Sequence, residues 1–155
     1  MTGIRTIGVI GAGQMGNGIA HVCALAGFDV LLNDVSAERL EAGLKTIQRN
    51  MDRQVHRQMI TKDQRDAAVK RIKAAKSLAD FADVEFAIEA ETEKEAVKRA
   101  IFDELCPKLA KTAMVATNTS SISITRLGTS TDRPERFIGL HFMNPVPLMQ
   151  LVEVI

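Results

Sequence analysis

The sequence contains no tryptophan and no tyrosine, and six phenylalanines supply its whole content of large aromatic side chains. Proteins that bind single-stranded nucleic acid stack the bases on such side chains, so their scarcity argues against that class. An excess of one charge is also missing, because 20 Lys and Arg residues stand against 19 Asp and Glu residues, for a formal net charge of +1. We therefore expect no nucleic-acid partner and no attraction to an anionic membrane.

Cysteine is nearly absent, with Cys23 and Cys106 as the only two. Their separation matches no common zinc spacing, so no metal site is predicted, and two thiols do not make a disulfide framework. We expect both to be reduced and buried, in a cytoplasmic protein. Residues 1–5 lack the features of a signal peptide, and no apolar run has the length of a membrane span.

Short apolar runs alternate with amphipathic segments along the chain. The run from Ile4 to Ile10 is rich in β-branched residues and ends at Gly11, residues 14–26 have helical periodicity, and residues 29–34 form a second apolar run. A strand, a helix and a strand in about thirty residues make a βαβ unit, in which the two strands are parallel.

Two long helices are expected next. Ser36 has the residue type of an N-cap for a helix that reaches towards Met59, and Thr61-Lys62-Asp63-Gln64 predicts a cap for a second helix that continues to about Lys76. Together they predict a helical hairpin that protrudes from the sheet. A later helix is expected at 94–109, and the remaining runs with strand character are 84–90, 113–117, 136–142 and 151–155.

No linker rich in Pro, Gly or Ser interrupts the 155 residues, so we expect one domain over residues 1–155. The alternation of strands and helices predicts an α/β fold with a Rossmann-like, doubly wound and mostly parallel sheet. The apolar run at 152–155 ends abruptly, which suggests a parent protein that continues beyond it.

A glycine-rich motif, Gly11-Ala12-Gly13-Gln14-Met15-Gly16, fits the G-x-G-x-x-G fingerprint. Alone it can be no more than a tight turn, but here it follows a predicted strand and opens a predicted helix, as dinucleotide binding requires. The glycines permit the turn, the approach of a pyrophosphate and the packing of the helix on the strand. We therefore predict cofactor binding, with the pyrophosphate at the helix N-terminus, by Gly11, Gly13, Gln14, Met15 and Gly16.

Asp34 ends the second predicted strand, 21 residues after Gly13. A carboxylate at this place accepts hydrogen bonds from the ribose hydroxyls of NAD and repels the 2′-phosphate of NADP. A solvated loop aspartate is the alternative, and the nearby Arg39 leaves open a contact with a phosphate. NAD is the expected cofactor.

His141 lies at the end of a predicted strand, where α/β sheets bind ligands, and Glu153 follows it by twelve residues. A lone histidine is more often structural than catalytic. A carboxylate that orients the ring favours catalysis, because a histidine whose pKa lies near neutrality can take a proton from an alcohol.

Two blocks now become recognisable, Asn118-Thr119-Ser120-Ser121-Ile122 and His141-Phe142-Met143-Asn144-Pro145-Val146-Pro147. Behind a Rossmann fingerprint they resemble the signature region of the L-3-hydroxyacyl-CoA dehydrogenases, with the bacterial 3-hydroxybutyryl-CoA dehydrogenases as the most similar subset. The resemblance covers residues 7–155 and corresponds to the N-terminal, NAD-binding half of such enzymes. It implies NAD-dependent oxidation of an L-3-hydroxyacyl-CoA, with a short acyl chain such as 3-hydroxybutyryl, to the 3-oxoacyl-CoA.

The resemblance also implies roles for individual residues. His141 is expected to be the general base that takes the proton of the substrate 3-hydroxyl, and Glu153 to hold its imidazole. Ser120 is expected to hydrogen-bond the substrate oxygen, and Asn144 to shape the pocket. Lys98, together with Glu93, matches positions that contact the cofactor in the family.

This chain departs from the family at Met143, where a phenylalanine is usual, and at Glu91, where a small or apolar residue is usual. A basic stripe runs along the long helix at Lys45, Arg49, Arg53 and Arg57. It is either a solvated face or, as the resemblance implies, the site of the coenzyme A phosphates, for which Arg49, Arg53 and Arg57 are candidates.

Family members continue into a mostly helical C-terminal domain that supplies a further active-site asparagine and forms the dimer. We expect the parent protein to be a homodimer through that domain, which residues 1–155 do not contain. The alternatives are a nucleotide-binding module without catalysis, a sugar-acid dehydrogenase of the L-gulonate type, and a structural role like that of the related lens crystallins.

Overall fold

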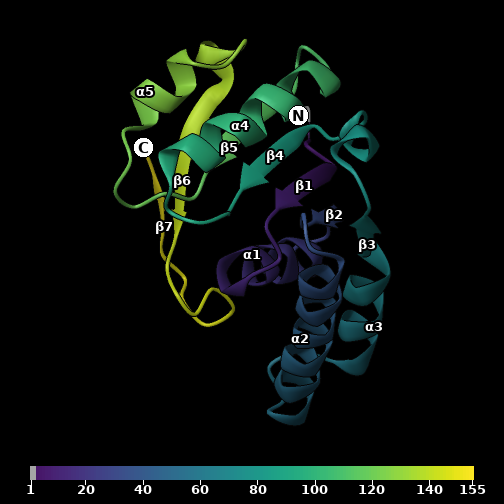
Figure 1. The fold of residues 1–155 in the computed structure, drawn as a ribbon. Helices are drawn as coiled ribbons and strands as arrows, with labels where there is room; N and C mark the ends of the chain where they lie inside the picture. Colours follow the sequence, from purple (N-terminus) through teal and green to yellow (C-terminus); the bar gives the residue numbers. More distant parts are fainter. Residues whose placement is uncertain (1–2) are drawn as a thin grey trace.

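The computed structural model describes residues 3–155. They form a seven-stranded sheet in the order β3-β2-β1-β4-β5-β6-β7, with helices on both faces (Figure 1). Every neighbouring pair is parallel except β6 and β7, which are antiparallel. The predicted Rossmann-like, mostly parallel fold is confirmed.

The first βαβ unit follows the hydrophobic pattern. β1 (Thr6–Ile10) pairs with β2 (Asp29–Asn33), and α1 (Gln14–Leu25) connects them. The strands are mostly buried, as strands covered on both faces are. Gly27, just beyond α1, has φ +103° and lets the chain turn back towards the sheet.

The predicted hairpin consists of α2 (Ala37–His56) and α3 (Lys62–Arg71), and it extends away from the sheet beside α1 (Figure 1). Ser36 caps α2 by accepting a hydrogen bond from the amide of Arg39, and Thr61 forms a capping box with Gln64 at the start of α3. Both predicted caps are confirmed.

The predicted extension of the second helix to Lys76 was wrong. α3 ends at Arg71, and β3 (Ile72–Ala75) adds a parallel edge strand beside β2. The side chain of Asn33 donates a hydrogen bond to the carbonyl of Ala75 at 2.8 Å. Pairing with the open edge of β2 therefore decides the structure of a segment whose own sequence has weak strand character.

The second half contains β4 (Phe86–Glu89), α4 (Glu95–Leu105), β5 (Met114–Thr117), α5 (Ile124–Thr129), β6 (Phe137–Phe142) and β7 (Val152–Val154). The predicted helix at 94–109 ends early, and residues 106–108 form a 3₁₀ turn. Helix α5 was not predicted, because six residues are too few for a helical period to be recognised.

Two apolar clusters pack on opposite faces of the sheet. One joins α1 and α2 to β1 and β2, and includes Ile19 and Ile47; the other joins α4 to β4 and β5, and includes Phe102. Cys23 and Cys106 are buried, one in each cluster, and burial raises their pKa values to about 12 and about 11. Within residues 3–155, no helix combines the length and apolar character that crossing a bilayer needs.

Candidate active site

The glycine-rich loop between β1 and α1 is shaped by close backbone contacts. Gly11 has φ +102°, and a Cβ there would lie 2.7 Å from the carbonyl oxygen of Ala90; a Cβ on Gly16 would lie 1.5 Å from the carbonyl oxygen of Gly11. A Cβ on Gly13 would meet nothing within 4 Å. The first and third glycines are therefore required by packing, whereas the second faces open space.

The N-terminus of α1 is suited to an anion. Its N-cap, Gly13, provides no side-chain hydrogen bond, and the first turn contains no acidic residue. The side chain of Asn17 is directed to the loop, where it donates to the carbonyl of Gly13 at 2.7 Å. These features fit the pyrophosphate of a dinucleotide, because helix N-termini offer amide donors and a positive dipole.

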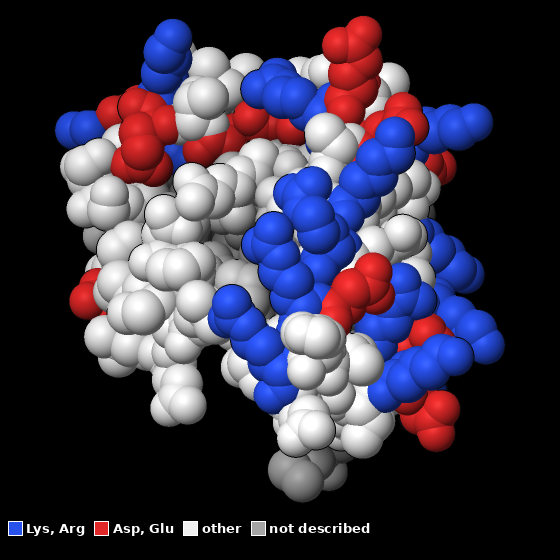
Figure 2. All heavy atoms as spheres, turned by 90° about the horizontal axis from the view of Figure 1, so that it is seen from below, with Lys and Arg blue, Asp and Glu red and all other residues white. Residues whose placement is uncertain are grey.

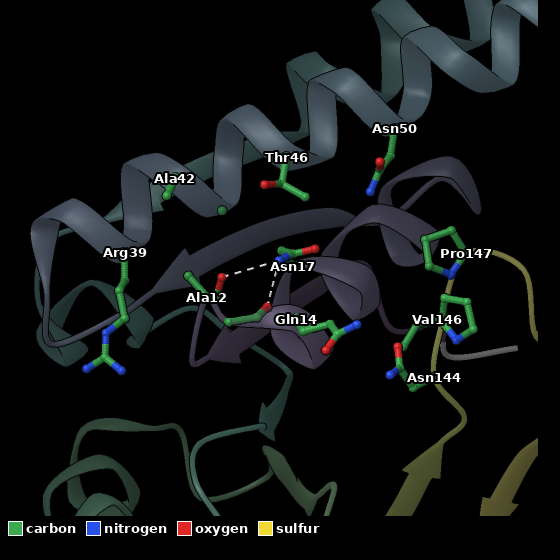
Figure 3. A pocket seen from close by; sticks show the side chains of 13 residues that line it. Ala12, Gln14, Asn17, Arg39, Ala42, Thr46, Asn50, Asn144, Val146 and Pro147 are labelled. Carbon is green, nitrogen blue, oxygen red and sulfur yellow. Dashed lines mark hydrogen bonds between the residues drawn. The ribbon is translucent and has the colours of Figure 1, made fainter.

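A cavity of about 420 Å³ lies between this loop and α2 (Figure 3). Arg39 stands at one end of it, Asn50 and Asn144 stand at the other, and Gln14 and Thr46 lie between them. The cavity begins at Arg39, in the first turn of α2, and runs past the N-terminus of α1. That course fits an extended nucleotide.

Asp34 lies at the β2 end of this region with only 6% of its surface exposed. Its Oδ2 accepts a hydrogen bond from the amide of Ala12 at 3.0 Å, and its Oδ1 accepts one from the amide of Ser36 at 2.9 Å. The Nε of Arg39 is 3.4 Å from Oδ1. The structure thus ties Asp34 to the glycine-rich loop, while its contact with a ribose stays a prediction.

A second cavity, of about 340 Å³, gathers residues that the sequence analysis selected from four separate segments. Its lining includes Met15, Glu93, Ser120, His141 and Asn144. Asn144 lines both cavities, so the two adjoin at that residue. The predicted cofactor loop and the predicted catalytic residues therefore form one continuous region.

His141 and Glu153 are directly opposite each other in the antiparallel β6–β7 pair. The imidazole Nδ1 lies 3.5 Å from the carboxylate Oε2 of Glu153, with the histidine side chain 23% and the glutamate side chain 50% exposed. The predicted juxtaposition is present. It leaves Nε2 as the ring nitrogen that does not face the carboxylate.

Asn118 has a supporting role that the sequence analysis did not identify. Its Oδ1 accepts a hydrogen bond from the amide of Phe142 at 2.8 Å, and its own amide donates to the carbonyl of Glu89. It therefore ties the carboxyl ends of β4, β5 and β6 together beside His141. Its place next to the end of a predicted strand and at the start of the block 118–122 was the available signal.

Lys98 is paired with a buried carboxylate, and its contact with the cofactor stays a prediction. Its side chain is fully buried, as is that of Glu89, and its Nζ donates to the two carboxylate oxygens of Glu89 at 2.9 and 2.8 Å. The ammonium also lies 3.6 Å from a carboxylate oxygen of Glu93. Lys98 therefore faces the buried carboxylate beneath the cavity and reaches the cavity lining through Glu93 and through the carbonyl of Glu91.

Glu93 holds the loop that carries Ser120. Its Oε2 accepts hydrogen bonds from the hydroxyls of Thr119 and Ser121, both at 2.7 Å. Burial by itself raises the pKa of Glu93, but these two hydrogen bonds and the charge of Lys98 outweigh it and leave the pKa below its ordinary value. The residues on both sides of Ser120 are thus fixed to a charged carboxylate.

The basic stripe on α2 is exposed, and Lys and Arg side chains gather on the face seen from the hairpin end (Figure 2). Arg53 and Arg57 line a cavity of about 230 Å³ together with Pro145 and Pro147. Lys45, by contrast, is paired with Glu41 at 2.8 Å. The arginines therefore border the segment that follows His141, whereas Lys45 stands apart.

Comparison with known proteins agrees with this geometry. The family model described as "3-hydroxyacyl-CoA dehydrogenase, NAD binding domain" matches residues 6–155. A 3-hydroxybutyryl-CoA dehydrogenase of Bradyrhizobium diazoefficiens is 63% identical over 152 residues, which are 98% of this chain and 52% of the relative. A probable 3-hydroxybutyryl-CoA dehydrogenase of Deinococcus radiodurans is 46% identical over 148 residues, 96% of this chain and 53% of the relative.

Among solved structures, the (S)-3-hydroxybutyryl-CoA dehydrogenase of Ralstonia eutropha superposes with a TM-score of 0.95 at 41% identity, over 98% of this chain and 54% of that one. The chain thus spans about half the length of the relatives it matches. With the fingerprint, the fold and the signature residues in place, this chain belongs to the family of NAD-binding domains of the 3-hydroxyacyl-CoA dehydrogenases, and its cofactor is NAD.

Proposed function

We propose that this chain carries the NAD site and the catalytic base of an enzyme that oxidises L-3-hydroxyacyl-CoA to 3-oxoacyl-CoA. The observation that supports this most strongly is His141, paired with Glu153, in the same cavity as Ser120 and Asn144, adjoining the glycine-rich loop. A dehydrogenase needs a base for the hydroxyl proton close to the hydride acceptor, and this arrangement meets that need.

When bound, NAD supplies the acceptor for the hydride of the substrate carbon. His141 takes the proton of the substrate hydroxyl at Nε2, while Glu153 stabilises the resulting imidazolium through Nδ1. Ser120, fixed between two residues that hydrogen-bond Glu93, donates to the substrate oxygen. In the reverse direction, protonated His141 returns the proton to the developing alkoxide.

We propose a short acyl chain, 3-hydroxybutyryl, because the relatives from Bradyrhizobium and Deinococcus are named for that substrate. Arg53 is proposed to bind a coenzyme A phosphate, since it borders both the basic face of α2 and the segment that follows His141. Lys45 lies on the same stripe but is paired with Glu41, and it serves as the matched control.

The test is oxidation of NADH by acetoacetyl-CoA, followed by the loss of NADH absorbance. It is run on this chain alone and on this chain joined to the C-terminal half of the Bradyrhizobium relative, because the chain covers 52% of that enzyme. We expect His141→Ala to lower kcat at least about a hundredfold, as removal of a general base does. Glu153→Gln is expected to lower kcat less.

Arg53→Ala is expected to raise KM for acetoacetyl-CoA with little change in kcat, and Lys45→Ala to change neither. NADH binding without turnover in the joined enzyme would favour a nucleotide-binding module. Turnover of L-gulonate in place of the CoA ester would favour a sugar-acid dehydrogenase.

A further inference from the structure

Glu91 stands at the cofactor side of β4 and is not explained by the proposed reaction. The Cβ position of Gly11 lies 2.7 Å from the carbonyl oxygen of Ala90 and 3.2 Å from the amide nitrogen of Glu91, so this residue borders the glycine-rich loop. Its amide donates to Glu89 Oε2 at 2.7 Å, and its carbonyl accepts from Lys98 Nζ at 3.3 Å. The buried ion pair therefore fixes the backbone of Glu91.

The side chain of Glu91 is less well satisfied than its backbone. Its Oε1 is buried and has no hydrogen-bond partner within residues 3–155. Burial raises the pKa of Glu91, and the negative charge of Asp34 raises it further, while the positive charge of Arg39 opposes both. The carboxyl group therefore lies in the field of the two residues that mark the ribose end of the predicted cofactor site.

Arg39 lies at the ribose end of the predicted cofactor site and could bind a phosphate, but it already pairs with a carboxylate. Its Nε lies 3.4 Å from Asp34 Oδ1, and that carboxylate is held in place by the amides of Ala12 and Ser36. Asp34 contacts this guanidinium directly, and the Glu91 carboxyl lies close enough for the charges of Asp34 and Arg39 to change its pKa. A 2′-phosphate, with close to two negative charges at neutral pH, meets a net repulsive environment there.

We propose that Glu91 is a specificity-determining residue that acts with Asp34 to exclude the 2′-phosphate of NADP(H) and to make the site selective for NAD(H). This role rests on the NAD site of the domain and does not depend on the proposed dehydrogenase reaction. It also gives a use to a carboxyl group at a position where the family resemblance leads one to expect a small or apolar side chain.

The test is the pair of dissociation constants for NADH and NADPH, measured by titration of nucleotide fluorescence on this chain without substrate. Removal of one unit charge that acts on a dianion across roughly 6 Å of water-like dielectric corresponds to about a tenfold change. We expect Glu91→Gln to lower the ratio of the NADPH to the NADH dissociation constant about tenfold or more. Glu91→Ala, as a second variant, is expected to lower it by a similar factor.

Asp83→Asn is the matched control, because it removes the same charge from an exposed residue that precedes β4, whereas Glu91 follows it. It is expected to leave the ratio unchanged. An unchanged ratio in both Glu91 variants overturns the proposal, and so does an equal fall in Asp83→Asn, which would make the effect one of net charge. Failure of the dehydrogenase proposal appears only in the kinetic assay, since these constants need no turnover.

Discussion

Replacement of Lys98 by methionine tests the buried network beneath the site. Both Lys98 and Glu89 have fully buried side chains, and their atoms approach to 2.8 Å. The variant keeps the length of the side chain but leaves Glu89 without a counter-charge, with hydrogen bonds from the Thr117 hydroxyl at 2.6 Å and the Glu91 amide at 2.7 Å as its remaining support. Breaking a buried pair on one side lowers the free energy of unfolding by about 3–5 kcal/mol.

In a domain of this size, roughly 2–4 °C of melting temperature corresponds to 1 kcal/mol, so the midpoint is expected to fall by roughly 6–20 °C. The assay is thermal and urea unfolding of this chain, followed by circular dichroism. Lys108→Met is the control. Lys108 pairs with Glu104, and the two side chains are 37% and 61% exposed, so the pair contributes less than about 1 kcal/mol to the free energy of unfolding.

The double variant Lys98→Met/Glu89→Gln removes both charges and is expected to be more stable than Lys98→Met alone. The reasoning is refuted if Lys98→Met lowers stability by less than about 1 kcal/mol, or if the double variant is no more stable than the single one.

Three further predictions concern the loop, the hairpin and the Ser120 segment. Gly16→Ala is expected to lower the melting temperature strongly, because its Cβ would lie 1.5 Å from a carbonyl oxygen. The Cβ of Gly13→Ala would meet open space, so this variant is expected to weaken NADH binding with little loss of stability. Burial lowers the pKa of His21 despite its hydrogen bond with Gln54. As the pH falls below about 6.5, the imidazole therefore binds a proton in the unfolded chain before it does so in the folded one, and the free energy of unfolding falls. Urea unfolding between about pH 7 and pH 5 is expected to show a smaller loss in His21→Gln than in the natural sequence. Glu93→Gln is expected to lower kcat in the joined enzyme, because it weakens the hydrogen bonds that fix the residues beside Ser120.

Each of these three predictions can be contradicted by a specific result. Equal melting temperatures for the two glycine variants would contradict the assigned packing, and an identical pH dependence in His21→Gln would show that other groups dominate acid destabilisation. An unchanged kcat in Glu93→Gln would mean that the Ser120 loop is held by other contacts.

The elements that formed a clear local pattern were predictable. The β1–α1–β2 unit, the caps at Ser36 and Thr61 and the strand that ends near His141 all appear where the sequence indicated. β3 was not predictable in this way, because residues 72–75 form a strand only through pairing with β2, which lies about forty positions earlier in the chain.

In the site, too, some features could be predicted from the sequence and others depend on the fold. The pairing of His141 with Glu153 followed from a resemblance, and the antiparallel register of β6 and β7 supplies its physical cause. The burial of Lys98 could not be read from its helix, since the exposure of one lysine depends on which carboxylate the sheet places beside it. The environment of Glu91 likewise depends on three segments that meet only in the fold.

The most direct test of the account uses NADH that carries deuterium at both C4 positions of the nicotinamide, with acetoacetyl-CoA as acceptor, in the joined enzyme. We expect a 3-hydroxybutyryl-CoA product with one deuterium at C3, detected by mass spectrometry, and a rate that falls at least about a hundredfold in His141→Ala while NADH binding is kept. A product without deuterium, or an undiminished rate in His141→Ala, would contradict the central claim that this region combines hydride transfer with proton removal by His141.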